Sequence, residues 1–214
     1  MARSVILREL TMGMLVSVNI FLLTLLISLP LGLLVSFGRR SKHRLLSSVV
    51  KFYIAIMRGT PLMLQLIVVY FAPYYVFGAN LRNFRFPAII IAFSINYAAY
   101  FAEIYRGGIE AIPVGQYEAA KVLGYSRGQT FSRIIFPQVI KIILPSITNE
   151  TITLVKDTSL AFVLAQAEMF TIAKEIAAKE ASVKPLMIAG LFYFVFNYLV
   201  AFVMERMEKA LSYY

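Results

Sequence analysis

The chain alternates long uncharged apolar segments with short charged ones. The first apolar segment runs from Leu10 to Gly38, and crossing a hydrocarbon core of about 30 Å takes about 20 helical residues. It exceeds the roughly 7–15 apolar residues of a signal peptide, so we expect it to remain as a membrane span. Four further apolar segments follow, at Phe52–Phe77, Phe86–Ala102, Gln138–Ala165 and Pro185–Met204. The pattern predicts an all-α membrane protein with five transmembrane helices in a single domain, residues 1–214.

The composition agrees with this class. Hydrophobic residues make up 60% of the chain and charged residues 15%, against roughly 45–50% and 25% in soluble domains. These values exclude an ordinary soluble fold, although the formal net charge is +10. The chain has no cysteine and one histidine, which excludes a thiolate or multi-histidine metal site within one chain.

Positive charge is concentrated directly after the first span, in the sequence GRRSKHR at residues 38–44. Lys and Arg near span ends resist translocation, so this loop is expected in the cytoplasm. That orientation places most of the 21 Lys and Arg residues inside, with the N-terminus outside and the C-terminus cytoplasmic. We therefore interpret the charge as orientation and contact with anionic membrane lipid, with no nucleic-acid partner and a solvated His43.

The connection from Arg106 to Pro137 is too long for a turn and patterned enough to contain two short helices. The first is expected over Gln116–Leu123, with Gly124 closing it as a C-terminal cap. Ser126 and Gln129 form a capping box for a second helix, which Pro137 is expected to stop. Isolated helices this short are marginal in water, so we expect another protein to dock on them.

Two alternatives compete with docking. The stretch EAAKVLGYSRGQTF superficially resembles a DNA-binding helix-turn-helix, but it lies between two membrane spans. A lipid-surface amphipathic loop is the second alternative. The GYSRGQT segment lacks the Lys and the spacing of a phosphate-binding loop, so the chain has no ATP site of its own.

The same loop carries a family resemblance. Glu118, Ala119, Ala120 and Gly124, followed by an apolar pattern that ends in Pro137, match the EAA signature of the membrane subunits of ABC importers. The sequences RGTPL from Arg58 and KDTSL from Lys156 further resemble permeases of the histidine/glutamine/arginine group of polar amino-acid importers. The resemblance extends over roughly residues 10 to 210.

The resemblance implies a type I ABC importer permease fold in the bacterial plasma (inner) membrane. It implies a dimer of permease subunits, for which we favour two identical copies, and an extracytoplasmic amino-acid-binding protein. The EAA loop would be a cytoplasmic coupling helix seated on a separate ABC ATPase dimer, through Glu118, Ala119, Ala120 and Gly124. ATP and Mg²⁺ would be bound by that ATPase, and this chain would hold no cofactor and catalyse no reaction.

Ionisable groups at membrane depth are costly and usually face a protein interior or an aqueous path. Polar residues are spaced seven apart in three spans, which would place each pair on one helix face. The pairs are Arg58 with Gln65, Asn96 with Glu103, and Glu150 with Asp157. We expect these stripes to line one cavity. The candidate substrate-binding residues are Gln65, Asn96, Tyr100, Glu103, Glu150, Thr153 and Asp157.

Several of these charges have a structural alternative. Glu103 and Arg106 could form an ion pair, and Lys156 could pair with Asp157 or extend to the interface. We interpret Arg58 as structural. The acids at membrane depth exceed the bases by one charge, which favours a basic amino acid. The alternative function is an ion-driven secondary transporter that uses these acids as a proton relay, and the EAA signature favours the importer.

Overall fold

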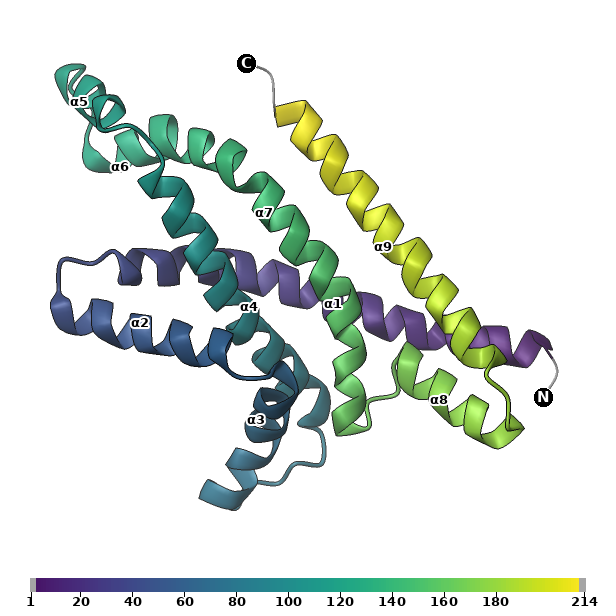
Figure 1. Cartoon of the computed structure of the whole chain (residues 1–214). Coiled ribbons are helices and arrows are strands. Elements are labelled where there is room, and N and C mark those ends of the chain that lie inside the picture. The colour runs from purple at the N-terminus through teal and green to yellow at the C-terminus, as the bar shows by residue number, and fades with distance from the viewer. Residues whose placement is uncertain (1–2, 212–214) are drawn as a thin grey trace.

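The computed structural model describes residues 3–211, and their secondary structure is helical (Figure 1). The elements follow in this order: α1 (Arg3–Arg39), α2 (Arg44–Gly59), α3 (Leu62–Phe77), α4 (Arg85–Glu110), α5 (Val114–Val122), α6 (Arg127–Gln129), the π-helical turn η1 (Thr130–Ile135), α7 (Phe136–Asp157), the 3₁₀ helix η2 (Thr158–Leu164), α8 (Met169–Glu180) and α9 (Lys184–Leu211).

Four helical segments in the described part are long and apolar enough to cross a membrane. They are Ser4–Arg39, Arg85–Glu110, Arg127–Leu164 and Lys184–Leu211. The bent pair α2 and α3 passes the same test together, so the number of candidate spans reaches 5 when this pair counts as one. The prediction of an all-α membrane protein is therefore confirmed.

The span expected over Phe52–Phe77 is not one continuous helix, so the prediction that Arg58 and Gln65 share a helix face is wrong. The helix breaks between Gly59 and Leu62, and α2 and α3 meet at 113°. Pro61 lacks an N–H and disfavours helical backbone at the preceding residue, and Thr60 accordingly has φ −121° and ψ 149°. Arg58 and Gln65 consequently lie on two different helices and do not share a helix face.

The loop helices agree with the sequence pattern except at Pro137. Helix α5 ends as expected, because Gly124 adopts φ +78° and Tyr125 N donates to Ala120 O at 3.0 Å. The capping box is present, with Gln129 N donating to Ser126 Oγ at 3.3 Å. The expected stop before Pro137 is wrong. The helix runs through η1 into α7, where Pro137 occupies the first turn and its missing N–H is tolerated.

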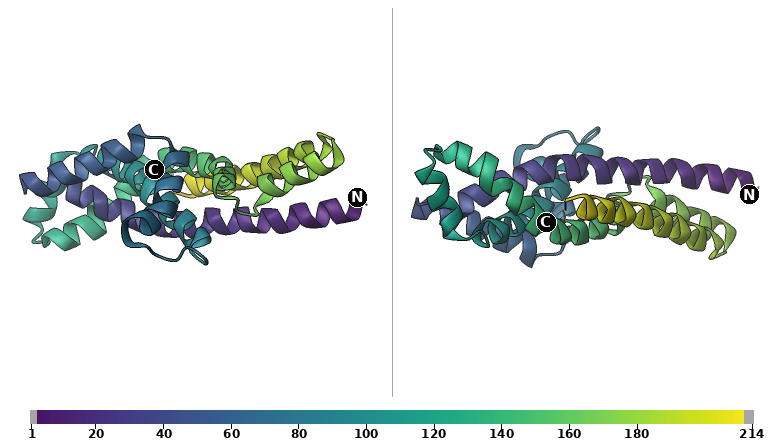
Figure 2. Two further views of the ribbon diagram at one scale, coloured as in Figure 1. Left: turned by 90° about the horizontal axis from the view of Figure 1, so that it is seen from below. Right: turned by 90° about the horizontal axis from the view of Figure 1, so that it is seen from above.

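Helix α8 is absent from the sequence prediction. It packs against α1 and α9 (Figure 2), and the loop from Ala165 to Ala167 joins it to η2. Its N-cap is Glu168, which is not among the residue types usually found at that position. A start signal based on Ser, Thr, Asp or Asn therefore misses it.

The core is built around α4. This helix packs against α1, α2, α3 and α7, and its side chains Phe93, Tyr97 and Phe101 are fully buried. Close approach depends on small residues, as is typical of membrane helices. A Cβ at Gly32 of α1 would lie 2.7 Å from Phe101 Cβ.

Apolar side chains on the outer faces remain exposed. On α9 they form one broad surface of Leu191, Phe194, Val195, Tyr198, Leu199 and Phe202. A soluble protein rarely exposes such a surface, whereas a membrane helix exposes it to lipid. The exposed apolar faces and the lengths of the spans therefore both indicate a membrane protein.

Helices α4 and α7 pack closely at Gly108. A Cβ at Gly108 would overlap Ile143 Cγ2 and approach Val139 Cγ1 to 3.2 Å, whereas a Cβ at Gly107 would meet nothing within 4 Å. We expect Gly108→Ala to lower the free energy of unfolding by about 1–3 kcal/mol through overpacking. Gly107→Ala should be neutral or slightly stabilising, because alanine is the better helix former.

Thermal unfolding of the two purified variants in detergent checks this expectation. Equal melting temperatures would contradict the close α4–α7 contact.

Candidate functional site

A cavity of about 420 Å³ lies where the break between α2 and α3 faces α4, α7 and η2. It is lined by Thr60, Pro61, Leu62, Asn96, Tyr97, Tyr100, Glu150, Thr153, Asp157 and Leu160. Its size falls in the range of roughly 300–1,000 Å³ that is usual for small-molecule sites. The lining holds two carboxyl groups and no Lys, Arg or His, so the cavity is acidic.

The broken helix supplies one wall of the cavity. Breaking a helix leaves carbonyl groups of its last turn without partners, and in a membrane these must be satisfied by protein groups. Gln65 Nε2 donates to Met57 O at 3.0 Å and to Thr60 O at 3.1 Å. Asn96 Nδ2 donates to Met57 O and to Gln65 Oε1, both at 2.9 Å. These two buried amides hold the unwound segment in place.

The acids come from the opposite wall. Glu150 and Asp157 lie two turns apart on α7, as the seven-residue spacing predicts, and both line the cavity. Tyr97 Oη donates to Asp157 Oδ2 at 2.8 Å. Arg58 extends over the ring of Tyr100, with Cζ 5.2 Å from the ring centroid, and interacts electrostatically with Glu150. Lys156 is exposed.

The structure brings most of the expected residues together. Asn96, Tyr100, Glu150, Thr153 and Asp157 all line the cavity. Gln65 does not, because the break turns it toward the carbonyl groups.

Two polar lining residues were not among the candidates. Tyr97 lies next to the expected stripe of α4, and Thr60 belongs to the unwound segment. The X-Pro pair at Thr60 and Pro61 is the sequence signal that could have located the break.

Glu103 lies outside the cavity lining, in a cluster of ion pairs. Arg106 Nη2 approaches Glu103 Oε2 at 2.7 Å, and Arg39 Nε of α1 lies 3.6 Å from Glu103 Oε1. Arg106 also pairs with Glu110 at 2.6 Å. The structure therefore favours the ion-pair alternative for Glu103, which ties the ends of α1 and α4 together.

The coupling-loop candidates lie on and directly after α5. Ala120 is buried, whereas Glu118 and Ala119 are exposed. The apolar side chains of Val122 and Leu123 are 87% and 71% exposed. In the described residues, this short helix thus presents apolar surface away from the rest of the chain, as expected of a docking element.

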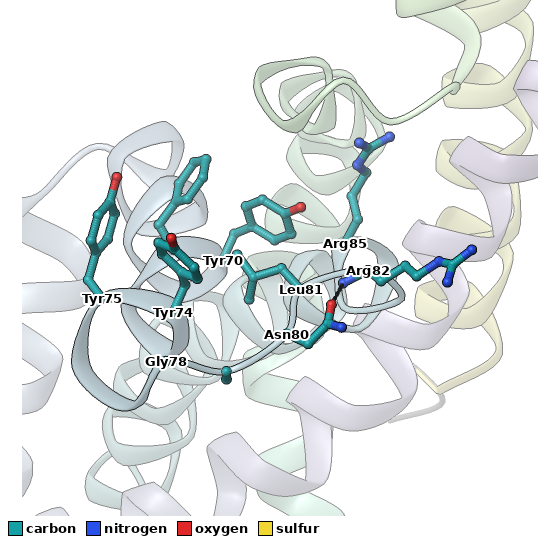
Figure 3. A pocket seen from close by; sticks show the side chains of 10 residues that line it. Tyr70, Tyr74, Tyr75, Gly78, Asn80, Leu81, Arg82 and Arg85 are labelled. Carbon is teal, nitrogen blue, oxygen red and sulfur yellow. Dashed lines mark hydrogen bonds between the residues drawn. The ribbon is translucent and has the colours of Figure 1, made fainter.

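A second cavity, of about 690 Å³, lies at the N-terminal end of α4, the end remote from α5 (Figure 3). Tyr70, Tyr74 and Tyr75 of α3 line one side. Arg82 and Arg85 are both exposed, and Arg85 Nη1 donates to Ala165 O at 3.0 Å. The mixture of tyrosine and arginine is typical of protein-binding surfaces.

Residues 28–213 match the family described as the binding-protein-dependent transport system inner membrane component. The arginine transport system permease protein ArtQ of Bacillus subtilis is 36% identical over 201 residues, which cover 94% of this chain and 91% of the relative. The L-cystine transport system permease protein TcyB of the same organism is 35% identical over 206 residues, covering 94% of this chain and 86% of the relative. The putative glutamine transport system permease protein GlnP of Rickettsia conorii is 33% identical over 198 residues, covering 92% and 90%.

Solved structures of ABC transporters also resemble this chain. A chain from the crystal structure of an amino acid ABC transporter with histidines superposes with a TM-score of 0.85 at 31% identity, covering 95% of this chain and 94% of the other. A chain of the MetNI methionine ABC transporter in an inward-facing conformation gives a TM-score of 0.73 at 18% identity, covering 99% of this chain and 100% of the other, and supports the fold alone.

Glu103 provides a prediction that separates a structural acid from a cavity acid. Glu103→Gln should lower the free energy of unfolding by about 1 kcal/mol or less, because the ion pairs are only partly shielded from solvent. Binding of labelled arginine should be unchanged, because Glu103 does not line the cavity. Glu110→Gln, which removes the more exposed partner of Arg106, is the matched control.

Thermal unfolding and equilibrium binding measure the two effects. If Glu103→Gln weakened arginine binding tenfold at unchanged stability, Glu103 would be a residue of the binding site after all.

Proposed function

Since the chain belongs to the family of binding-protein-dependent transport system inner membrane components, we propose that its acidic cavity carries a basic amino acid across the membrane. The chain is the permease subunit of an ABC importer for polar amino acids, and the ATPase is a separate protein. Membership in this family excludes the alternative function, an ion-driven secondary transporter. The protein is a multi-pass inner membrane protein.

The preference for a cation rests on the charges around the cavity. Glu150 and Asp157 are the only charged groups among the described lining residues. Arg58 and the exposed Lys156 interact electrostatically with Glu150 and Asp157 from outside the lining, so the charge within the cavity itself is that of the two acids. A ligand ammonium or guanidinium group would balance this charge and gain charge-assisted hydrogen bonds. The arginine permease among the relatives is consistent with this preference.

Coupling would use the direct helical connection between the loop and the cavity. Helix α5 packs against η1, and η1 continues without interruption into α7, which carries Glu150 and Asp157. A displacement of α5 by an ATPase would therefore be passed through η1 to α7 and its two acids. Thr60 and Pro61, on the other wall, belong to the separate pair α2 and α3. The two walls can thus change their separation when ATP drives closure of the ATPase.

The remaining partners follow from the family and from exposed surfaces. The ATPase dimer would dock on Glu118, Ala119, Ala120 and Gly124, in the loop of residues 106–137. A second copy of this chain would cover exposed apolar side chains of α3 such as Leu64 and Val68. The extracytoplasmic binding protein would dock at the tyrosine and arginine cavity. In this arrangement the N-terminus lies outside, the C-terminus is cytoplasmic, and residues 1–214 form one permease domain.

The carboxyl groups of the cavity generate the main prediction. Glu150→Gln and Asp157→Asn keep the side-chain size and remove the charge. Each should weaken arginine binding by about 1.5–3 kcal/mol, roughly tenfold to a hundredfold. The binding of glutamine, which carries no side-chain cation, should be weakened much less. Labelled amino acids and the purified permease–ATPase complex without binding protein give the affinities directly.

An equal loss for arginine and glutamine would contradict the charge argument. Loss of assembly in both variants would show instead that the two acids are needed for folding.

Coupling is tested at Gly124. Its backbone is left-handed, and a Cβ there meets nothing within 4 Å in this chain, so the obstacle to a side chain comes from a docked partner and from the backbone. Gly124→Asp should reduce ligand-stimulated ATP hydrolysis about tenfold or more, because a buried unpaired charge opposes docking.

Gly124→Asn is the control. Asparagine tolerates the left-handed backbone and adds no charge, so hydrolysis should fall less. Arginine binding should survive in both variants, and normal hydrolysis by Gly124→Asp in an assembled complex would contradict the docking assignment.

A further inference from the structure

A groove outside the proposed transport path lies between α1 and α8, at the end of the molecule remote from α5 (Figure 1). Its volume is about 490 Å³, within the range that is usual for small-molecule sites. Two stripes of side chains line it, and each has the spacing i, i+3, i+4, i+7 of a single helix face. The stripes are Val5, Arg8, Glu9 and Met12 on α1, and Ile172, Glu175, Ile176 and Lys179 on α8.

The two walls of the groove are fixed to each other at one end. Ser17 Oγ of α1 donates to Glu168 Oε2 at 3.4 Å and accepts from Met169 N at 3.4 Å. A Cβ at Gly13 would lie 2.9 Å from the Met169 backbone, so the two helices are in contact there. From this junction α8 runs back along α1, toward the N-terminal end of α1 (Figure 2). The protein itself therefore holds the walls of the groove in place.

Polarity changes along the groove. Met12 and Ile172 lie at the end near the junction, and Met12 belongs to the apolar segment that starts at Leu10. Arg8 and Glu9 directly precede that segment, so they mark the membrane interface. One end of the groove is thus apolar at membrane depth, and the other end is charged at the interface. A lipid has the same order, because its headgroup lies at the interface and its acyl chains lie deeper.

The charged end of the groove holds two bases and two acids, Arg8, Lys179, Glu9 and Glu175. Glu9 is half-buried and the other three side chains are exposed. Glu175 and Lys179 have the i, i+4 spacing that favours an ion pair on a helix. Within residues 3–211, however, none of the four groups forms an ion pair. They therefore remain available to a ligand that carries both signs of charge.

A phosphoethanolamine headgroup matches this set of charges. Its phosphate would accept hydrogen bonds from Arg8 and Lys179, and its primary ammonium group would donate to Glu9 and Glu175. An anionic phosphoglycerol headgroup has no cation and would leave the two acids unbalanced. A phosphocholine headgroup is zwitterionic, but its trimethylated nitrogen has no N–H to donate.

We propose that this groove binds phosphatidylethanolamine, with the headgroup between the four charged side chains and an acyl chain against Met12 and Ile172. The bound lipid bridges α1 and α8 at the end that the Ser17 junction does not reach. This site depends neither on the identity of the transported amino acid nor on the docking of the ATPase.

Native mass spectrometry of the delipidated permease–ATPase complex tests the proposal. The complex is titrated separately with phosphatidylethanolamine, phosphatidylcholine and phosphatidylglycerol that carry the same acyl chains. Phosphatidylethanolamine should bind about fivefold tighter than either of the other two lipids, because only its headgroup satisfies both the bases and the acids. Equal affinities for the three lipids, or tighter binding of phosphatidylglycerol, would overturn the proposal.

Two substitutions at exposed positions separate the roles of the charges. Lys179→Gln should weaken the binding of phosphatidylethanolamine and phosphatidylglycerol about fivefold each, because both lipids carry the phosphate. Glu175→Gln should weaken phosphatidylethanolamine about threefold and strengthen phosphatidylglycerol, because it removes an ammonium partner and a repulsive charge. Lys174→Gln is the matched control, since Lys174 lies on the same helix but outside the lining.

The control should change neither affinity. Equal effects of Lys179→Gln and Lys174→Gln would overturn the proposal, and so would a Glu175→Gln variant that changes the affinities for both lipids in the same direction.

Two soluble probes distinguish other occupants of the groove. Glycerophosphoethanolamine, which lacks acyl chains, should compete for the site at least about tenfold more weakly than the lipid, because it buries nothing against the apolar end. Equal affinity would show that the groove holds a soluble zwitterion and would overturn the assignment to a lipid. Displacement of the lipid by L-arginine would identify a second amino-acid site and would overturn it too.

Discussion

The architecture depends on the rule that backbone polar groups inside a membrane must find partners within the protein. The break between α2 and α3 leaves the carbonyl groups of Met57 and Thr60 outside the helix ladder, and the amides of Gln65 and Asn96 bond them. An unwound segment at membrane depth is tolerated where it is buried or lines a cavity. Here Thr60 and Pro61 line a cavity, and the proposed substrate site lies where the helix is interrupted.

The opposite wall shows how the site is joined to its surroundings. Helix α7 carries both cavity acids and is continuous through η1 with the loop that begins with α5, the element proposed to dock on the ATPase. At its other end α7 passes into η2, whose neighbours are α1, α3 and α8. In the proposed complex, the acids would therefore lie between the ATPase contact at α5 and the contacts of η2 with its neighbouring helices. This placement would let a movement of α5 reach the acids.

The sequence predicted the parts that depend on local patterns. Charge-free length located the spans, a seven-residue spacing brought Glu150 and Asp157 to one face, and Gly124 and Ser126 marked helix ends correctly. It failed where tertiary contacts decide. The carbonyl group of Met57, freed at the Pro61 break, is bonded by Asn96 of α4, and Glu168 at the start of α8 is bonded by Tyr193 of α9. Glu103 looked like a cavity residue by spacing, and Arg39 from another helix gives it a structural role.

The most direct measurement is the position of L-arginine in an experimental structure of the permease–ATPase complex. We expect its guanidinium group to lie within hydrogen-bonding distance of Glu150 and Asp157, beside the unwound segment at Thr60 and Pro61. Arginine bound elsewhere in the assembled complex, with this cavity filled only by water, would contradict it.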